Sequence, residues 1–156
     1  MVATSSGDRL EVIAHDLFDV FTQLCLAGLR GLRRMGDLKE VEFLTLSILQ
    51  EHRTRIVGDI QRQLGILPAQ MSRVIRSLET RAQPLITCGI NPNDKRKIDV
   101  CLTAAGEKAL LDYQSVRVTR IGQLLRSLSE DDQEDLARML DKLSSLLEHG
   151  HSSGAN

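Results

Sequence analysis

Three consecutive cations, Lys95, Arg96 and Lys97, are the side chains of this sequence best suited to bind a polyanion. They follow the turn-forming run Asn-Pro-Asn-Asp at 91–94, in which proline presets φ and the Asn and Asp side chains bond to nearby backbone. Apolar and polar residues then alternate over 98–102, the period-two pattern of a half-buried strand. The sequence therefore predicts a hairpin that holds cations away from the body of the protein. A solvated charged turn without a ligand is the alternative interpretation.

Two short helices are predicted before this hairpin, over 57–64 and 68–79. The residues Gly-Ile-Leu-Pro at 65–68 separate them, and Pro68 suits the first position of a helix. The apolar stripe of the second helix consists of Met71, Val74, Ile75 and Leu78. Its other sides carry Gln70, Ser72, Arg73, Arg76 and Ser77. Two short helices around a tight turn, the second polar and basic on its outer side, predict a helix-turn-helix.

Further helices are predicted on both sides of these elements, because apolar residues recur there every three or four positions. They cover 8–34, 39–52, 103–128 and 129–149. Asp8, Thr103 and Ser129 are suitable N-caps, and Gly36 is a suitable stop. The inner face of the second of these helices is expected to hold Val41, Leu44, Ile48 and Leu49. A strand at 85–88 completes the hairpin, and 54–56 is long enough only for a small strand or a turn.

The composition fits one domain with an aliphatic core. The chain has 156 residues, of which 42% are hydrophobic and 3% aromatic. Its net charge of −1 is unevenly distributed, because residues 51–99 carry nine basic and five acidic side chains between acidic flanks. Such asymmetry can mark a surface that binds a polyanion. No apolar run approaches the ~20 residues of a membrane span, and no signal-peptide pattern begins the sequence. We therefore expect a cytoplasmic protein without a membrane segment.

The sequence offers no support for an enzyme. Its four histidines are dispersed and lack the spacing of a metalloprotease motif. It contains neither a phosphate-binding glycine loop nor a recognisable nucleophile motif. The three cysteines, Cys25, Cys88 and Cys101, form no C-x-x-C pair, so we expect no metal and no cofactor. Their odd number also argues against structural disulfides in a cytosolic chain.

The hairpin and the residues after it resemble a known family. The run Asn91-Pro-Asn-Asp-Lys-Arg96 is similar to the D-P-x-D-x-R wing of the MarR family of bacterial transcriptional regulators. Val100-Cys-Leu-Thr-Ala-Ala-Gly106 resembles the strand-to-helix join that this family writes V-x-L-T-x-x-G. The order of helices also matches, from Asp8 to about His149. The resemblance implies a mainly α fold with a small β-hairpin wing. Its parts would be a winged helix-turn-helix lobe at 37–102, a helical dimerisation region at 8–36 and 103–149, and flexible tails at 1–7 and 150–156.

A homodimer is expected on physical grounds as well. Long amphipathic helices at both ends carry more leucine than a small lobe could cover, so they need a partner surface. The resemblance implies that the N-terminal helix and the last two helices of each subunit interlock. A monomer whose helices fold back on their own lobe is the alternative.

The resemblance implies a repressor that binds a pseudo-palindromic operator in double-stranded DNA. Side chains near the start of a recognition helix read bases in the major groove. Here these are Ala69, Gln70, Ser72 and Arg73, and Arg76 is placed one turn further on, for phosphate. In the wing, Arg96 would enter the minor groove, with Asp94 holding its guanidinium extended. Lys95 and Lys97 would contact phosphates. A small aromatic or anionic effector is implied too, although the sequence indicates none of its binding residues.

The sequence departs from the family pattern in three places. Leu67 stands at the N-cap of the recognition helix, where Ser or Thr is common. The segment 80–84 is longer than usual and lacks a glycine, and Gly89 and Ile90 stand where the wing often has basic residues. Two alternatives therefore stay open. One is a dimeric interaction module with weak or lost DNA binding, and the other is a regulator that senses oxidants through a cysteine.

Overall fold

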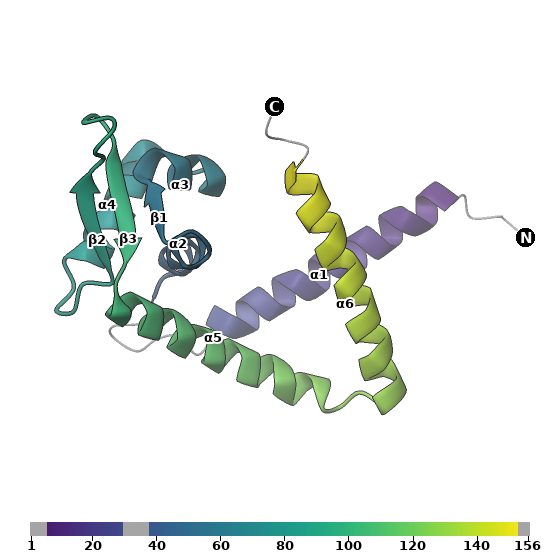
Figure 1. The fold of residues 1–156 in the computed structure, drawn as a ribbon. Coiled ribbons are helices and arrows are strands. Elements are labelled where there is room, and N and C mark those ends of the chain that lie inside the picture. Colours follow the sequence, from purple (N-terminus) through teal and green to yellow (C-terminus); the bar gives the residue numbers. More distant parts are fainter. Residues whose placement is uncertain (1–5, 30–37, 153–156) are drawn as a thin grey trace, which may run out of the picture. The chain divides into compact units, whose positions relative to one another are not determined.

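The computed structural model describes residues 6–29 and 38–152 (Figure 1). Its elements, in chain order, are α1 (Ser6–Leu29), α2 (Glu40–Glu51), β1 (Thr54–Ile56), α3 (Val57–Leu64), α4 (Pro68–Glu79), β2 (Ile86–Ile90), β3 (Ile98–Leu102), α5 (Ala104–Leu125) and α6 (Glu130–Ser152). The chain divides into two compact units, Met1–Tyr113 and Gln114–Asn156, with the boundary inside α5. The predicted fold class, mainly α with a small β wing, is confirmed. The assignment of 8–36 and 103–149 to dimerisation stays a prediction.

An antiparallel sheet of three strands lies in the first unit, in the order β1-β3-β2. β2 and β3 pair from Ile86 opposite Leu102 to Ile90 opposite Ile98. The hairpin of residues 86–102 is called the wing from here on; its loop extends beyond the sheet in Figure 1. β2 starts one residue later than the predicted strand and continues two residues further, because Gly89 and Ile90 also pair with β3. β1 provides the third strand by pairing with β3.

The hydrophobic core of the first unit fills the space between the sheet and the surrounding helices. Its buried members are Leu38, Leu46, Ile48, Leu49, Ile60, Met71, Val74, Leu78, Leu85, Ile86, Val100, Leu110 and Tyr113. The stripe predicted for α4 faces this core. The inner face predicted for α2 is partly wrong, because Leu44 is 41% exposed and Leu46 is fully buried. α2 contacts α3, α4 and β3, so its buried face is wider than a single three-and-four stripe.

The ends of the two short helices are set by local signals. α3 ends at Gly65, whose φ of 63° lies in the left-handed region that favours glycine. The amide N–H of Gly65 donates to the carbonyl of Arg62 at 3.2 Å. α4 then begins with Pro68 at its first position, as predicted. This glycine–proline spacing fixes the turn of the helix-turn-helix.

The long helices end at other residues than those predicted. α1 begins at Ser6, so Asp8 lies in its first turn rather than at the N-cap, and the predicted stop at Gly36 lies outside the described residues. α5 ends at Leu125, because the amides of Ser127 and Leu128 bond three residues back and tighten the chain. α6 continues to Ser152 instead of ending at residue 149. The cap predicted at Ser129 is confirmed by a 3.2 Å hydrogen bond from the backbone N–H of Asp132 to Ser129 Oγ.

The start of α5 is locked to the start of β2. Thr103 Oγ1 accepts the backbone N–H of Gly106 at 3.0 Å, which confirms the predicted cap, and donates to the Pro84 carbonyl at 2.7 Å. The Thr103 N–H donates to the Leu85 carbonyl at 3.1 Å. Gly106 packs against the same carbonyl, where a β-carbon would lie 2.1 Å from the oxygen. Thr103 and Gly106 therefore bring both ends of the wing together.

Large apolar side chains remain exposed in the single chain along α1, α5 and α6. On α1 they are Leu10, Val12, Ile13, Leu17, Phe18, Val20, Phe21, Leu24 and Leu26. On α5 they are Leu111, Val116, Val118, Ile121 and Leu124, and on α6 Met139, Leu140, Leu146 and Leu147. Over the described residues, none of the helices combines the length and the apolar character needed to cross a membrane.

Candidate nucleic-acid interface

The helix α4 presents a polar face because its apolar stripe is buried. Met71, Val74 and Leu78 are each less than a tenth exposed. The side chains left at the surface include Ala69, Gln70, Ser72, Arg73 and Arg76. Its N-cap, Leu67, makes no side-chain capping bond, because leucine has no polar side-chain atom. The first amides of the helix are therefore left without a side-chain acceptor. All five residues predicted for the recognition helix are thus exposed.

A buried carboxylate connects α4 to α2. Glu42 is 1% exposed, and its Oε1 accepts a hydrogen bond from Ser77 Oγ at 2.6 Å. Its Oε2 accepts from Arg81 Nη2 at 2.8 Å and from the backbone N–H of Lys39 at 2.9 Å. Ser77, which we expected at the surface, is therefore half-buried and bonded. Glu42 fixes the recognition helix and the segment after it to the start of α2.

Sequence reasoning missed this arrangement because its partners are distant in the chain. Glu42 lies 35 residues before Ser77 and 39 before Arg81. A glutamate near a helix start is ordinarily assigned to the helix dipole. The sequence did hold one signal, because Glu42 stands two positions from the exposed Glu40 on a helix with a wide buried face. That spacing does not identify the partners of the carboxylate.

The loop at the tip of the wing is closed by one asparagine. Asn91 Oδ1 accepts the backbone N–H groups of Asn93 and Asp94, both at 2.9 Å. The Asn91 N–H donates to the Lys97 carbonyl at 3.0 Å, and the Lys97 N–H donates to the Asp94 carbonyl at 2.9 Å. The turn predicted from Asn-Pro-Asn-Asp is thus held by side-chain and backbone bonds together.

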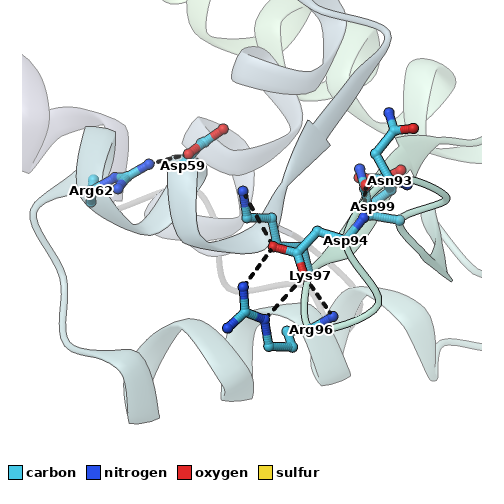
Figure 2. Close-up of polar contacts among 8 residues, drawn as sticks. Asp59, Arg62, Asn93, Asp94, Arg96, Lys97 and Asp99 are labelled. Carbon is cyan, nitrogen blue, oxygen red and sulfur yellow. Dashed lines mark hydrogen bonds and ion pairs between the residues drawn. The ribbon is translucent and has the colours of Figure 1, made fainter.

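Asp94 organises the cations of the wing. Its Oδ1 accepts from Arg96 Nε at 3.2 Å and from the Arg96 backbone N–H at 3.1 Å, and Lys97 Nζ lies 3.7 Å from its Oδ2 (Figure 2). The side-chain and backbone hydrogen bonds from Arg96, followed by the charge of Lys97, lower the pKa of Asp94 below its ordinary value of 3.8. The carboxylate is therefore ionised at neutral pH. The contact expected between Asp94 and Arg96 is present, and the Arg96 side chain is 90% exposed.

A hollow of about 790 Å³ separates α3 and α4 from the wing. Its lining comprises Ile56, Val57, Gly58, Asp59, Arg62, Ser72, Ile75, Arg76, Glu79, Thr80, Cys88, Arg96, Lys97 and Ile98. Arg76 of the recognition helix and Arg96 of the wing thus border one concave surface. Asp59 pairs with Arg62 on its α3 side (Figure 2). The hollow brings together cations that the sequence places in three separate elements.

The predicted site residues do not all gather at this hollow. Gln70 and Arg73 line a smaller cavity of about 210 Å³ on the α2 side of the recognition helix, together with Lys39, Val41, Glu42, Val74 and Ser77. Lys95 is exposed at the wing tip and lies outside both. The face of α4 is therefore divided: Ser72 and Arg76 face the wing, and Gln70 and Arg73 lie toward α2.

Cys88 and Cys101 lie on opposite faces of the sheet. Cys88 pairs with Val100, and Cys101 pairs with Thr87, so their side chains alternate across the pleat. Burial, followed by the adjacent Glu79 carboxylate, raises the pKa of the Cys88 thiol to about 11. Cys101 Sγ lies 3.2 Å from Thr54 Oγ1. All three cysteines, including Cys25 on α1, are free thiols, and the sheet geometry opposes a disulfide between Cys88 and Cys101 within one chain. In the described part of the chain, no three His, Cys, Asp or Glu side chains are grouped as metal ligands.

A helix-turn-helix followed by a hairpin wing, with a short third strand beside it, defines a winged helix-turn-helix protein. Residues 38–98 match the sequence model of the MarR family. The matched residues include the wing motif at 91–96, and over them the resemblance to the MarR family is confirmed. None of the curated proteins compared with the chain matches it.

Solved structures share this fold over nearly the whole chain. A MarR family protein from Bacillus stearothermophilus has a TM-score of 0.77 at 16% identity, covering 93% of this chain and 99% of that one. The transcriptional regulator Tm0710 from Thermotoga maritima has a TM-score of 0.70 at 19% identity, with coverages of 91% and 98%. Bordetella bronchiseptica BpsR, whose DNA binding is regulated by 6-hydroxynicotinic acid, has a TM-score of 0.59 at 22% identity, with coverages of 85% and 98%. At these identities the likeness extends to the fold.

Proposed function

We propose that this protein is a sequence-specific transcriptional regulator that binds double-stranded DNA as a homodimer. The observation that carries the proposal is that Arg76 of the recognition helix and Arg96 of the wing border the same hollow. A duplex seated there would meet cations from two elements at once. Phosphate contacts of this kind supply affinity and position the protein, while base contacts supply sequence choice.

The recognition helix would read the major groove through its exposed first two turns. Gln70 suits adenine, Arg73 suits guanine, and Ala69 can contact a thymine methyl group. Ser72 Oγ, which donates to the Pro68 carbonyl at 3.0 Å, can still accept from a base or sugar. Arg76, which is one turn further on and faces the wing, would bind a phosphate. These roles follow from side-chain chemistry and exposure.

The wing would follow the backbone into the neighbouring minor groove. Arg96 is extended from the tip, held by Asp94, and is the side chain best placed to enter a narrow groove of high negative potential. Lys95 and Lys97 would contact phosphates on either side. Asp94 would act through Arg96, because its carboxylate would be repelled by the DNA if it stood alone.

A homodimer would cover the exposed apolar faces. The helices α1, α5 and α6 present rows of large apolar side chains that no other described part of the chain buries. Such faces on a small protein mark an interaction surface, and the commonest solution is a two-fold dimer of identical patches. Two lobes related by this axis would require a pseudo-palindromic operator.

Repression with release by a small molecule is the regulatory mode that we propose. Bound across a promoter, the dimer would exclude the transcription machinery. BpsR, which shares the fold, has its DNA binding regulated by 6-hydroxynicotinic acid, which is both aromatic and anionic. An effector of that class would act here only through different affinities for the DNA-bound and free forms.

The alternative candidate is a dimeric interaction module with weak or lost DNA binding. It is favoured by Gly89 and Ile90, which place no charge at the end of β2, the first strand of the wing, and Ile90 is 68% exposed. A redox-sensing regulator is favoured less, because the Cys88 thiol has a raised pKa and lies on the opposite face of the sheet from Cys101.

The test is binding of the full chain to DNA that flanks its own gene, beside random DNA of equal length. The proposal expects specific footprints with two-fold symmetry, and an affinity that falls steeply between low and moderate salt as phosphate contacts are lost. Equal affinity for both DNAs would contradict sequence-specific regulation. Absence of binding to either at low salt would favour the interaction module.

A further inference from the structure

The Asn91 amide connects the wing loop to strand β3. Its Oδ1 accepts the backbone N–H groups of Asn93 and Asp94, and its Nδ2 donates to Asp99 Oδ1 at 2.8 Å. Asp99 is a strand residue, paired with Gly89 of β2 and with Ile56 of β1. One side chain thus joins the loop end of the hairpin to the central strand of the sheet.

Only an amide can make these bonds at position 91. Its oxygen must accept and its nitrogen must donate, because the partners are two N–H groups on one side and a carboxylate on the other. An aspartate is nearly the same shape and can still accept from the loop. It has no proton to donate to Asp99 at neutral pH, so two carboxylates would stand at hydrogen-bond distance. Like charges that close are destabilising.

The loop that Asn91 closes is the one that carries Arg96. The Asn91 N–H binds the Lys97 carbonyl, and the Asp94 amide is bound by Asn91 Oδ1. Asp94 in turn accepts the guanidinium of Arg96 and lies next to Lys97. A change at Asn91 would therefore displace Asp94 first and the cations with it.

We infer that Asn91, bridged to Asp99, is a positioning residue that sets the wing tip and thereby aims Arg96 at DNA. The inference rests on the proposed function, since it assigns Asn91 a task in the same interface. Asn91 itself need not touch DNA. Asn91 would keep the loop ordered before DNA binds, and this reduces the entropy cost of ordering the loop on association.

The test uses an exchange of donor and acceptor in the full chain. Asn91→Asp opposes two carboxylates, whereas the double variant Asn91→Asp with Asp99→Asn restores one donor and one acceptor with them reversed, at unchanged net charge. The matched control is Asn93→Asp, which adds the same charge to an exposed residue of the same tip. It measures how much affinity the added charge alone removes. Thermal unfolding of each variant checks that the lobe stays folded.

Two readouts are measured, and the first needs no DNA. Amide hydrogen exchange at Asn93 and Asp94 should quicken in Asn91→Asp and return to the original rate in the double variant. Operator affinity should fall by about tenfold more in Asn91→Asp than in Asn93→Asp, and the double variant should lie within about threefold of the original protein.

Each outcome bears on a separate step. Unchanged exchange in Asn91→Asp would overturn the amide bridge. Altered exchange with the affinity of the Asn93→Asp control, in a protein whose unmodified form binds its operator, would overturn the aiming of Arg96. If the unmodified chain binds no DNA at low salt, the proposed function fails and the inferred role fails with it. Hydrogen exchange would still decide whether the bridge orders the loop.

Discussion

Gly106, in the first turn of α5, lies against the carbonyl of Leu85 so closely that a β-carbon would be 2.1 Å from the oxygen. The same carbonyl accepts the Thr103 N–H at 3.1 Å. The strand that leaves the wing and the segment that enters it therefore meet at one peptide group. The glycine of the V-x-L-T-x-x-G join is required by this approach rather than by backbone conformation.

We predict that Gly106→Ala destabilises the first unit by about 1–3 kcal/mol, as overpacking of a dense site typically does. The matched control is Gly122→Ala in the same helix, where a β-carbon would meet nothing within 4 Å. That change should leave stability equal or raise it by about 0.5–1 kcal/mol through helix propensity. Urea unfolding followed by circular dichroism measures both. Equal stability of the two variants would show that the peptide at Leu85 moves aside at little cost.

Glu42→Gln should loosen the recognition helix. The substitution keeps the shape but removes the charge that Arg81 Nη2 meets at 2.8 Å and that Ser77 Oγ meets at 2.6 Å. Leaving a buried polar group poorly satisfied typically costs about 1–3 kcal/mol. Glu51→Gln on the same helix, where the carboxylate side chain is 72% exposed, is the control and should be neutral. The unfolding midpoints of the two variants measure this difference. A Glu42 variant as stable as the Glu51 variant would contradict a structural role for the contacts of Glu42 with Ser77 and Arg81.

The elements that the sequence predicted well are those fixed by neighbouring residues. Gly65 and Pro68 stand three positions apart and set the turn between α3 and α4, so both helices begin and end where expected. The contact of Asp94 with Arg96 spans two positions and is equally local. Alternation over 98–102 likewise gave the bounds of β3.

The features that escaped prediction depend on partners far along the chain. Burial of Leu46 in place of Leu44 follows from the three elements that surround α2. The bonds of Glu42 reach across 35 and 39 residues. The shared hollow of Arg76 and Arg96 arises because the sheet brings the wing back alongside α4. Local pattern carries no information on such pairings, and only tertiary packing selects them.

We predict that Arg96→Ala lowers operator affinity by about tenfold or more without lowering the thermal midpoint, because its side chain is 90% exposed. Asp94→Asn gives a sharper test. Charge alone would make that variant bind DNA more tightly, whereas loss of the contact that holds Arg96 would make it bind more weakly. Asp59→Asn, which removes an acid from the α3 side of the same hollow, is the control for charge. Tighter binding by the Asp94 variant in a gel-shift titration would exclude a positioning role.

The contact between Asp94 and Arg96 should also persist in mild acid. Hydrogen bonds from Arg96 lower the pKa of Asp94 below 3.8, so the stabilisation is fully present above that pH and is lost only as the pH falls through the lowered value. From about pH 8 to 5 the chemical shift of the Asp94 carboxyl carbon should therefore stay that of a carboxylate. In Arg96→Ala the titration midpoint of the Asp94 carboxyl should move up toward 3.8. A midpoint unchanged by this substitution would mean that Arg96 is not the cause.

Cys88 should be a slow nucleophile. Burial and Glu79 raise its pKa to about 11 from 9.0, and the thiolate is the reactive form. Peptide-resolved labelling with iodoacetamide at neutral pH should modify Cys88 slowly, with a rate that rises about tenfold per pH unit until the pH nears that pKa. Glu79→Gln should increase the neutral-pH rate. Rapid labelling of the unmodified protein at pH 7, or a Cys88–Cys101 crosslink formed within one chain under peroxide, would reopen oxidant sensing in the wing.

Substitutions of Gln70 and of Arg76 should weaken DNA binding in different ways, because the two residues lie on different sides of α4. Gln70→Ala removes a base contact, so its loss of about 1–3 kcal/mol should appear with the operator and vanish with random DNA. Arg76→Ala removes a phosphate contact, so it should weaken both DNAs alike and reduce the slope of log affinity against log salt by about one per subunit. Arg138→Ala, an exposed cation of α6, controls for net charge. Fluorescence anisotropy across a salt series gives all of these slopes. If Gln70→Ala lowers the salt slope while Arg76→Ala changes base preference, the two faces of α4 have the opposite roles to those proposed.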